Sequence, residues 1–219
     1  MQFAISTASV AGLLKPKLTA IADAGFEAIE LAESDLLSSP YSAEYTGALL
    51  RELGLRCMAF DGLCDFEGLT GADHASALRR AEFKFDLMQD LDVELLIVTA
   101  SSRRDASMDD RRIAADLRVL GERAQARGLR IAYEAASGAA QVRTLQQAAA
   151  IVAAVEHPAV GLALDTTLLD AEALAALANF DITKIFHVSI ADLASAPIGT
   201  EWAARHQDRK STRLNSSHV

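Results

Sequence analysis

Three acidic residues stand at or just beyond the carboxyl ends of short apolar segments in the second half of the sequence. Glu134 lies near the end of RIAYEA, Asp165 ends VGLALD, and Asp192 follows IFHVSI. If these segments are parallel strands of one barrel, the three side chains converge at one end of the sheet. Two carboxylates at an apolar mouth repel each other and are costly to ionise unless a cation sits between them.

This pattern favours a divalent metal site built on Glu134 and Asp165. Hard oxygen ligands suit Mg²⁺ or Mn²⁺, and Zn²⁺ or Co²⁺ become competitive if an imidazole joins them. The alternative is that each acid caps the helix that follows it. Two acids on neighbouring strands favour the metal.

The elements that must position these acids follow a repeating pattern. Short apolar segments rich in β-branched residues alternate with amphipathic segments, as in a buried parallel sheet with covering helices. The clearest helix follows Ser107, a candidate N-cap, and ends near Gly128. The alternation predicts an α/β fold that either closes as a (β/α)8 barrel or stays an open sheet. The predicted strands are residues 3–8, 28–33, 56–61, 95–100, 130–135, 160–165 and 185–190.

Composition narrows the class of protein. A chain of 219 residues with 51% hydrophobic content predicts one globular domain, and its net charge of −9 disfavours nucleic acid as a partner. No apolar segment approaches the roughly 20 residues of a membrane span, and no secretory signal follows Met1, so we expect a cytoplasmic protein that makes no membrane contact. Glycine-rich dinucleotide or phosphate-binding motifs do not follow any predicted strand.

Several segments resemble the xylose isomerase-like barrels, which belong with the sugar phosphate isomerases and epimerases. They are STASVAGLLKPKLTAIADAGFEAIELAESDLL, DFEG, AEFKFDLMQDL, GLRIAYEA, HPAVGLALD and WAARH, and together they are most similar to the bacterial 3-dehydroshikimate dehydratase branch. The resemblance implies a (β/α)8 TIM barrel with one divalent metal held by four side chains at the strand ends. It implies a small polyhydroxylated carbonyl substrate, in this branch 3-dehydroshikimate, which loses water to form protocatechuate. Glu134 and Asp165 match the first two metal ligands, and Glu134 is the expected catalytic residue.

The other positions that match the family motifs carry changed residues. Ser189 stands where the family has Gln or His as third ligand, and His187, two residues earlier on the same strand face, is a possible substitute or a hydrogen-bonded core residue. Gln141 replaces a His and can still bind a substrate hydroxyl. Glu33 and Arg205 are further candidates for substrate binding, unless they are solvent-facing residues.

Two departures bear on the reaction. Leu168 replaces an acid/base histidine, and Cys64 replaces an arginine suited to a substrate carboxylate. The leading prediction is a metal-dependent dehydratase. The alternatives are a sugar or cyclitol isomerase or epimerase with a changed substrate, and a binding relative without turnover. A nucleic-acid enzyme of the related endonuclease barrels would need more strand-end histidines and a basic face.

The last residues of the chain differ from the rest in kind. Residues 208–219, DRKSTRLNSSHV, are polar and lack an apolar period, and one choice of codons for residues 208–218 matches a widely used sequencing adapter. We therefore expect residues 1–207 to be a TIM barrel truncated after about seven strands, followed by a foreign tail. On this interpretation the family's eighth-strand ligand, a Glu, is missing. The chain as written is then expected to be poorly stable, aggregation-prone and inactive.

Overall fold

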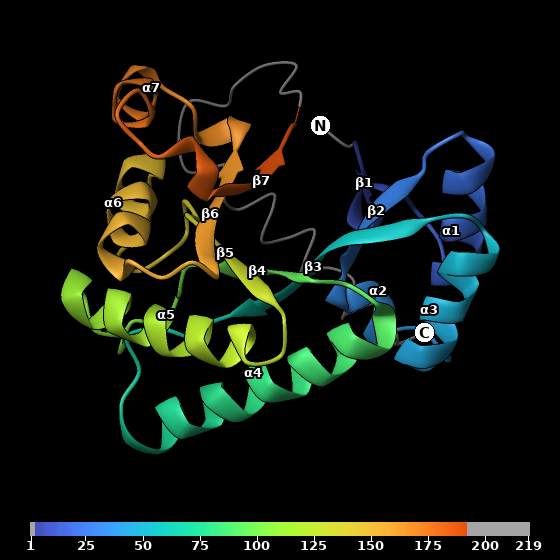
Figure 1. The fold of residues 1–219 in the computed structure, drawn as a ribbon, viewed down its shortest axis with the longest axis horizontal. Coiled ribbons are helices and arrows are strands. Elements are labelled where there is room, and N and C mark those ends of the chain that lie inside the picture. The colour runs from blue at the N-terminus through green and yellow to red at the C-terminus, as the bar shows by residue number, and fades with distance from the viewer. Residues whose placement is uncertain (1–2, 192–219) are drawn as a thin grey trace, which may run out of the picture.

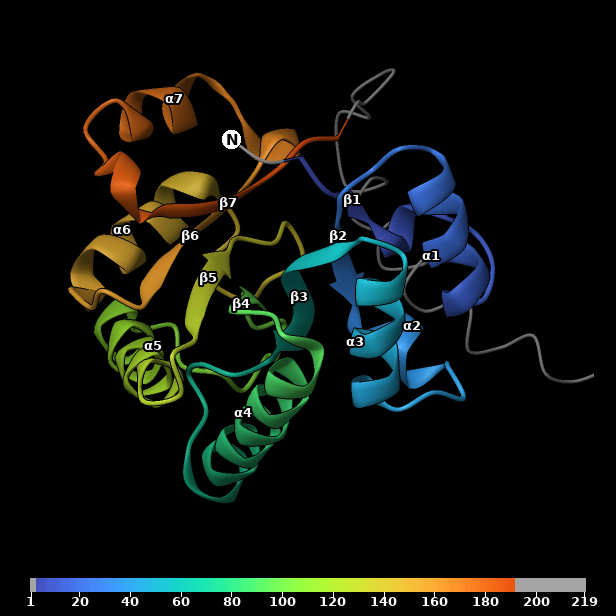
Figure 2. The same ribbon diagram turned by 45° about the vertical axis from the view of Figure 1, so that its right-hand side comes forward.

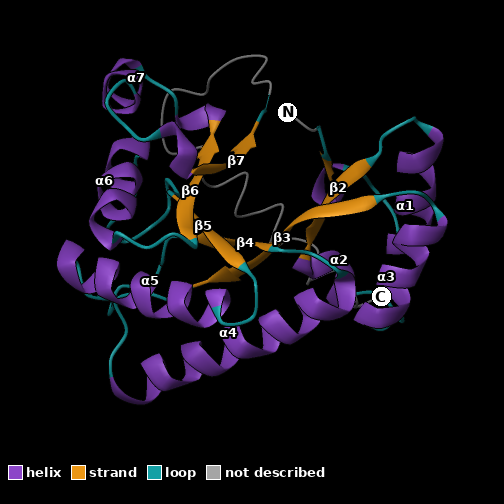
Figure 3. Ribbon diagram, in the orientation of Figure 1, coloured by secondary structure: helices purple, strands orange, loops and turns teal. Residues whose placement is uncertain are grey.

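A computed structural model describes residues 3–191 of the chain. In this range one parallel sheet carries seven strands, and each strand pairs with its neighbour in sequence order. The sheet curls into a half-barrel with the helices on its outer side (Figure 1; Figure 3). The predicted TIM-barrel class is confirmed. Arg205 and the predicted foreign tail, residues 208–219, lie outside the described residues.

The strands agree with the predicted segments to within a few residues. They are β1 (Ile5–Ser6), β2 (Ala28–Ala32), β3 (Arg56–Cys64), β4 (Leu95–Thr99), β5 (Arg130–Glu134), β6 (Val160–Asp165) and β7 (Ile185–Ser189). The α-helices are α1 (Leu14–Asp23), α2 (Glu33–Leu37), α3 (Ala43–Glu52), α4 (Gly71–Leu91), α5 (Asp110–Gln125), α6 (Leu145–Val155) and α7 (Ala171–Leu177). Three short 3₁₀ helices are η1 (Thr7–Ser9), η2 (Thr166–Leu168) and η3 (Ile182–Lys184).

The two faces of the sheet carry different side chains because neighbours along a strand point to opposite faces. The outer face packs large apolar residues such as Phe60, Tyr133 and Leu162 against the helices. The inner face is lined by a separate and smaller cluster, in which alanines predominate. Its buried members are Ala59, Leu95, Ile97, Ala132 and Ala163, with Phe186 packed against them.

Local capping residues set the helix starts. Helix α6 begins with a capping box, in which the Thr144 hydroxyl accepts from Gln147 N and the Gln147 side chain accepts in return from the Thr144 backbone. The predicted N-cap Ser107 of α5 is wrong: Asp109 caps this helix, its carboxylate accepting from Arg111 N at 3.0 Å. Ser107 instead accepts a hydrogen bond from Asp109 N, so it shapes the turn before the cap. Gly128 lies beyond the helix end with a left-handed φ of 73°, as predicted.

A buried ion pair joins the first two helices to the start of the sheet. Lys17 of α1 is fully buried, and its Nζ donates to Asp35 Oδ1 at 2.6 Å and to the Thr7 carbonyl at 2.9 Å. The Thr7 hydroxyl accepts in turn from the backbone N–H of Ala32, at the end of β2. The contact therefore ties the segments after β1 and β2 together at the rim of the sheet.

Among residues 3–191, the structure contains no helix that is both long and apolar enough to cross a membrane.

We predict that Lys17→Met lowers the free energy of unfolding by about 3–5 kcal/mol, because it leaves the buried Asp35 carboxylate without its cation. Urea unfolding followed by circular dichroism measures the change. Lys15→Met is the matched control, since Lys15 is an exposed lysine of the same helix and its loss is expected to cost under about 0.5 kcal/mol. Equal effects of the two variants would contradict the prediction.

Candidate functional site

The strand register places the predicted ligands on one face of the sheet. Glu134 pairs with Ala163, which pairs with His187, so these three residues form one layer across β5, β6 and β7. Asp165 pairs with Ser189 in a layer closer to the strand ends. Because Ala163 belongs to the inner cluster, the alternation of side chains directs the other four residues toward the interior as well.

The two carboxylates have polar neighbours of their own. Thr99 of β4 donates from its hydroxyl to Glu134 Oε2 at 3.3 Å. Asp165 caps η2, with Oδ1 accepting from Thr167 N at 2.8 Å. The capping role considered for Asp165 is therefore real. It does not preclude a metal, because a carboxylate offers about four acceptor positions and this bond occupies one.

His187 is engaged across the interior. Its Nε2 lies 2.9 Å from Glu30 Oε2, and both side chains are mostly buried, with exposures of 17% and 16%. Glu30 lies on β2 and His187 on β7, so the contact links strands that are far apart in the sheet order. In Figure 2 the two ends of the curled sheet, β1–β2 and β7, approach each other. His187 is thus an interior residue that lies against the Glu30 carboxylate in this structure.

The donor set fits a divalent cation in part. Glu134 and Asp165 supply two hard, anionic oxygen donors from neighbouring strands on a shared face. Within the part of the chain that the structure describes, no three His, Cys, Asp or Glu side chains gather as a ready-made metal site. Ser189 lies next to Asp165 and adds a neutral hydroxyl. A hydroxyl is a weaker metal ligand than a carboxylate.

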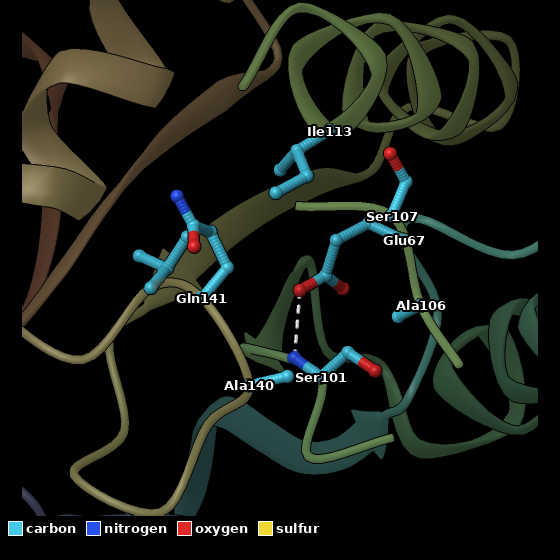
Figure 4. A pocket seen from close by; sticks show the side chains of 8 residues that line it. Glu67, Ser101, Ala106, Ser107, Ile113, Ala140 and Gln141 are labelled. Carbon is cyan, nitrogen blue, oxygen red and sulfur yellow. Dashed lines mark hydrogen bonds between the residues drawn. The ribbon is translucent and has the colours of Figure 1, made fainter. Parts of the chain in front are cut away.

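The loops that follow β3, β4 and β5, together with Ile113 of α5, line a small cavity (Figure 4). Gln141, the predicted hydroxyl-binding residue, lines this cavity and donates from Nε2 to Asp110 Oδ1 at 3.3 Å. Glu67 supplies the one carboxyl group among the residues that line this cavity. Gln141 therefore sits at the rim beside a buried carboxyl rather than among Glu134, Asp165 and Ser189.

Burial changes the acidity of two groups in this region. The pKa of Glu67 is raised, chiefly because burial disfavours its charged form, although hydrogen bonds from Ser101 N and Tyr133 oppose the shift. Burial and the neighbouring Glu67 carboxyl also raise the pKa of the Tyr133 phenol. Tyr133 therefore stays protonated and acts as a donor to Glu67.

Glu33 lies away from the interior. It is the first residue of α2 and pairs with Lys84 of α4, on the side of the helices. This position separates Glu33 from the face that carries Glu134. Cys64 is exposed at the end of β3, and Leu168 packs in η2 against the core. Arg205 falls outside the described residues.

Sequence reasoning assigned no role to Glu67, and Glu30, like Glu33, was only a residue of the second strand that could hydrogen-bond a sugar hydroxyl. Glu67 is the acid of DFEG, a segment that served only to indicate the family. An acid within two residues of Phe66 and Leu69, directly after a strand, signals a buried carboxyl. Glu30 carried a clearer signal, because it is a charged residue inside the apolar strand AIELA and faces the interior.

Comparisons with known proteins agree with this architecture. The sequence model of the xylose isomerase-like TIM barrel family matches residues 18–210. Two curated proteins named 3-dehydroshikimate dehydratase are similar over most of the chain. The Pseudomonas putida protein is 41% identical over 200 residues, 90% of this chain and 31% of that protein. The Pseudomonas aeruginosa protein is 42% identical over 195 residues, 88% of this chain and 31% of that protein.

A solved structure agrees as well. A xylose isomerase-like TIM barrel/4-hydroxyphenylpyruvate dioxygenase fusion protein superposes with a TM-score of 0.88 at 38% identity, covering 94% of this chain and 33% of that one. The chain thus spans about a third of the length of the relatives it matches. From the family match and the curled parallel sheet together, the chain belongs to the xylose isomerase-like TIM barrel family.

Proposed function

We propose that the chain is the barrel portion of a divalent-metal-dependent lyase that dehydrates 3-dehydroshikimate to protocatechuate. The observation that carries the proposal is the pair of carboxylates, Glu134 and Asp165, on one interior face at the strand ends. Similarity to two proteins named 3-dehydroshikimate dehydratase, at 41% and 42% identity, supports the substrate and the reaction. A cytoplasmic location and the lack of nucleic-acid or membrane partners stay predictions from composition.

Each interior residue has a place in this proposal. Glu134 and Asp165 would hold the ion, with Ser189 or His187 as a weaker third donor. Mg²⁺ or Mn²⁺ suits the two carboxylates best, and Zn²⁺ or Co²⁺ would require the imidazole. When bound, such an ion supplies Lewis acidity at a carbonyl oxygen.

Proton transfer falls to the residues of the chain. Dehydration removes a proton from the carbon next to the carbonyl and a hydroxyl from the carbon beyond it. Leu168 has no ionisable group, so we assign the proton abstraction to Glu134, which faces the interior. Gln141 binds a substrate hydroxyl from the loop after β5.

One observation favours a second candidate, a sugar or cyclitol isomerase or epimerase. Cys64, exposed at the end of β3, offers no positive charge to a substrate carboxylate. A neutral polyhydroxylated substrate would not need one. The two candidates are distinguished by comparing turnover of 3-dehydroshikimate with turnover of neutral ketoses and inososes. Turnover of the neutral compounds alone would favour the isomerase or epimerase.

We predict that, in the full-length protein with its eighth strand, Glu134→Gln and Asp165→Asn each lower dehydratase turnover by about 10²-fold or more and weaken binding of Mn²⁺, because each removes a charged ligand. Protocatechuate formation and metal titration by calorimetry measure the two effects. Glu94→Gln is the matched control, since Glu94 is exposed at the opposite end of the sheet, where β4 begins. Unchanged metal binding in both site variants would refute the assignment.

Ser189 offers a test in the opposite direction. We predict that Ser189→His raises the affinity for Zn²⁺ or Co²⁺ about tenfold or more, a gain of about 1.4 kcal/mol, because an imidazole replaces a weak hydroxyl beside Asp165. Ser189→Ala is the control, and it is expected to alter affinity little. If the histidine variant binds no more tightly than wild type, Ser189 does not face the ion.

A further inference from the structure

Glu67 is a buried carboxyl whose two oxygens have different surroundings. The residue is 2% exposed. Its Oε1 accepts two hydrogen bonds, from Ser101 N at 2.6 Å and from the Tyr133 hydroxyl at 2.9 Å. Its Oε2 is also buried and has no hydrogen-bond partner among the described residues. A buried polar atom left in this state costs about 1–3 kcal/mol, so Oε2 calls for a partner outside the described residues, such as a water molecule.

The carboxyl lies where three rim loops meet. The loop after β3 carries Glu67. In the same loop the Gly68 carbonyl accepts a hydrogen bond from Ser107 N, in the loop after β4, at 2.8 Å. The loop after β4 donates Ser101 N to Glu67, and the Ser101 carbonyl accepts from Ala140 N, in the loop after β5, at 2.8 Å. Glu67 is thus two hydrogen bonds away from Ala140, the residue before Gln141.

The same loops also hold the backbone of the carboxylate strand. Ala100, the residue before Ser101, donates its N–H to the Glu134 carbonyl at 2.9 Å. One segment of the β4 loop therefore joins the Glu67 carboxyl to the end of β5.

The cavity beside Glu67 has the size and lining of a water site. It measures about 10 Å³, close to the space of one water molecule. Glu67, Ser107 and Gln141 supply polar side chains to its wall, and a buried water needs two to four such partners. In Figure 4 the Glu67 carboxyl lies above Ser101 and Ala140, and Gln141 lies to its left.

We propose that Glu67 is a positioning residue that holds Gln141, and the loops on both sides of it, through Ser101 and one buried water. The role of Gln141 in substrate binding rests on the proposed function, whereas the coupling between the two side chains does not. Ser101 N and Tyr133 occupy Oε1, so a proton on the carboxyl belongs on Oε2. From Oε2 the carboxyl proton donates a hydrogen bond to the water, and the water can form a second hydrogen bond with the Gln141 amide.

The charges around Glu67 favour this neutral form. Asp65 in its own loop and Asp110 and Asp116 at α5 are acidic, and Tyr133 on β5 stays protonated. Arg112 of α5 is bound to Asp116, so its positive charge is directed at that carboxylate, and His74 Nδ1 of α4 lies 4.0 Å from the same group. The raised pKa of Glu67 agrees with the neutral form.

The test measures melting temperatures of the full chain without metal or substrate between pH 4.5 and 8.5. The unfolded chain ionises Glu67 near its ordinary pKa of about 4.3, whereas the folded chain resists, so wild-type stability falls as the pH rises through the folded pKa. Glu67→Gln copies the neutral acid, with an acceptor for Ser101 N and a donor for the water. We expect it to melt near wild type at pH 4.5 and increasingly above wild type at higher pH.

Two further variants separate positioning from packing. Glu67→Leu fills the site without hydrogen bonds, and we expect it to melt several degrees below Glu67→Gln at every pH. Gln141→Ala is then introduced into wild type and into Glu67→Leu. Coupling through the water predicts a smaller melting shift from Gln141→Ala in the Glu67→Leu background. Glu27→Gln, at an exposed carboxylate before β2, serves as the control without a pH trend.

Equal shifts of Gln141→Ala in both backgrounds would overturn the positioning role. A Glu67→Gln variant that falls below wild type at all pH values would overturn the neutral carboxyl. Neither measurement involves turnover or metal, so either result stands whether or not Glu134 and Asp165 bind an ion.

Discussion

The alternation of side chains along seven parallel strands governs the chemistry of this molecule. Glu134, Asp165, His187 and Ser189 share the interior only because their strands pair in the register Glu134–Ala163–His187 and Asp165–Ser189. A slip of one residue would turn a strand's interior residues toward the helices and place an apolar residue such as Tyr133 inside. The polar rim thus depends on the large apolar outer face, which fixes the register by packing.

The pairing of β7 shows how closely that register is tied to packing. The β6–β7 register shifts between Leu162 and Ala163, and Phe186 lies in the shifted segment. A Cβ on Gly161 would come within 2.4 Å of the Phe186 ring, so a glycine is required where the ring crosses β6. Phe186 then joins the inner cluster, and His187 reaches Glu30 on the far side of the interior.

Buried charge in this fold is met by partners drawn from separate helices and strands. Lys17 meets Asp35 and the Thr7 carbonyl, and His187 meets Glu30. Glu67 differs from these pairs, because the groups that stabilise its carboxylate against the cost of burial are neutral hydrogen-bond donors and not a cation. A neutral carboxyl at a junction of three loops can order the rim without adding another negative charge near the two strand-end carboxylates.

Much of the architecture could be predicted from the sequence. The strand positions, the parallel sheet and the placement of Glu134 and Asp165 on one face of the sheet follow from periodicity and from acids at strand ends. These signals are local, since each depends on residues a few positions apart.

Other features were decided only by the tertiary structure. Asp109 rather than Ser107 caps α5 because the turn before the helix folds onto the Gly68 loop. Glu33 pairs with Lys84, 51 residues away, and Glu67 with Tyr133, 66 residues away. The sequence determined the order and type of the elements and the face on which each strand carries its acids. The partner of each buried charge was decided by how helices and loops distant in the chain pack together, because no local pattern records contacts at that range.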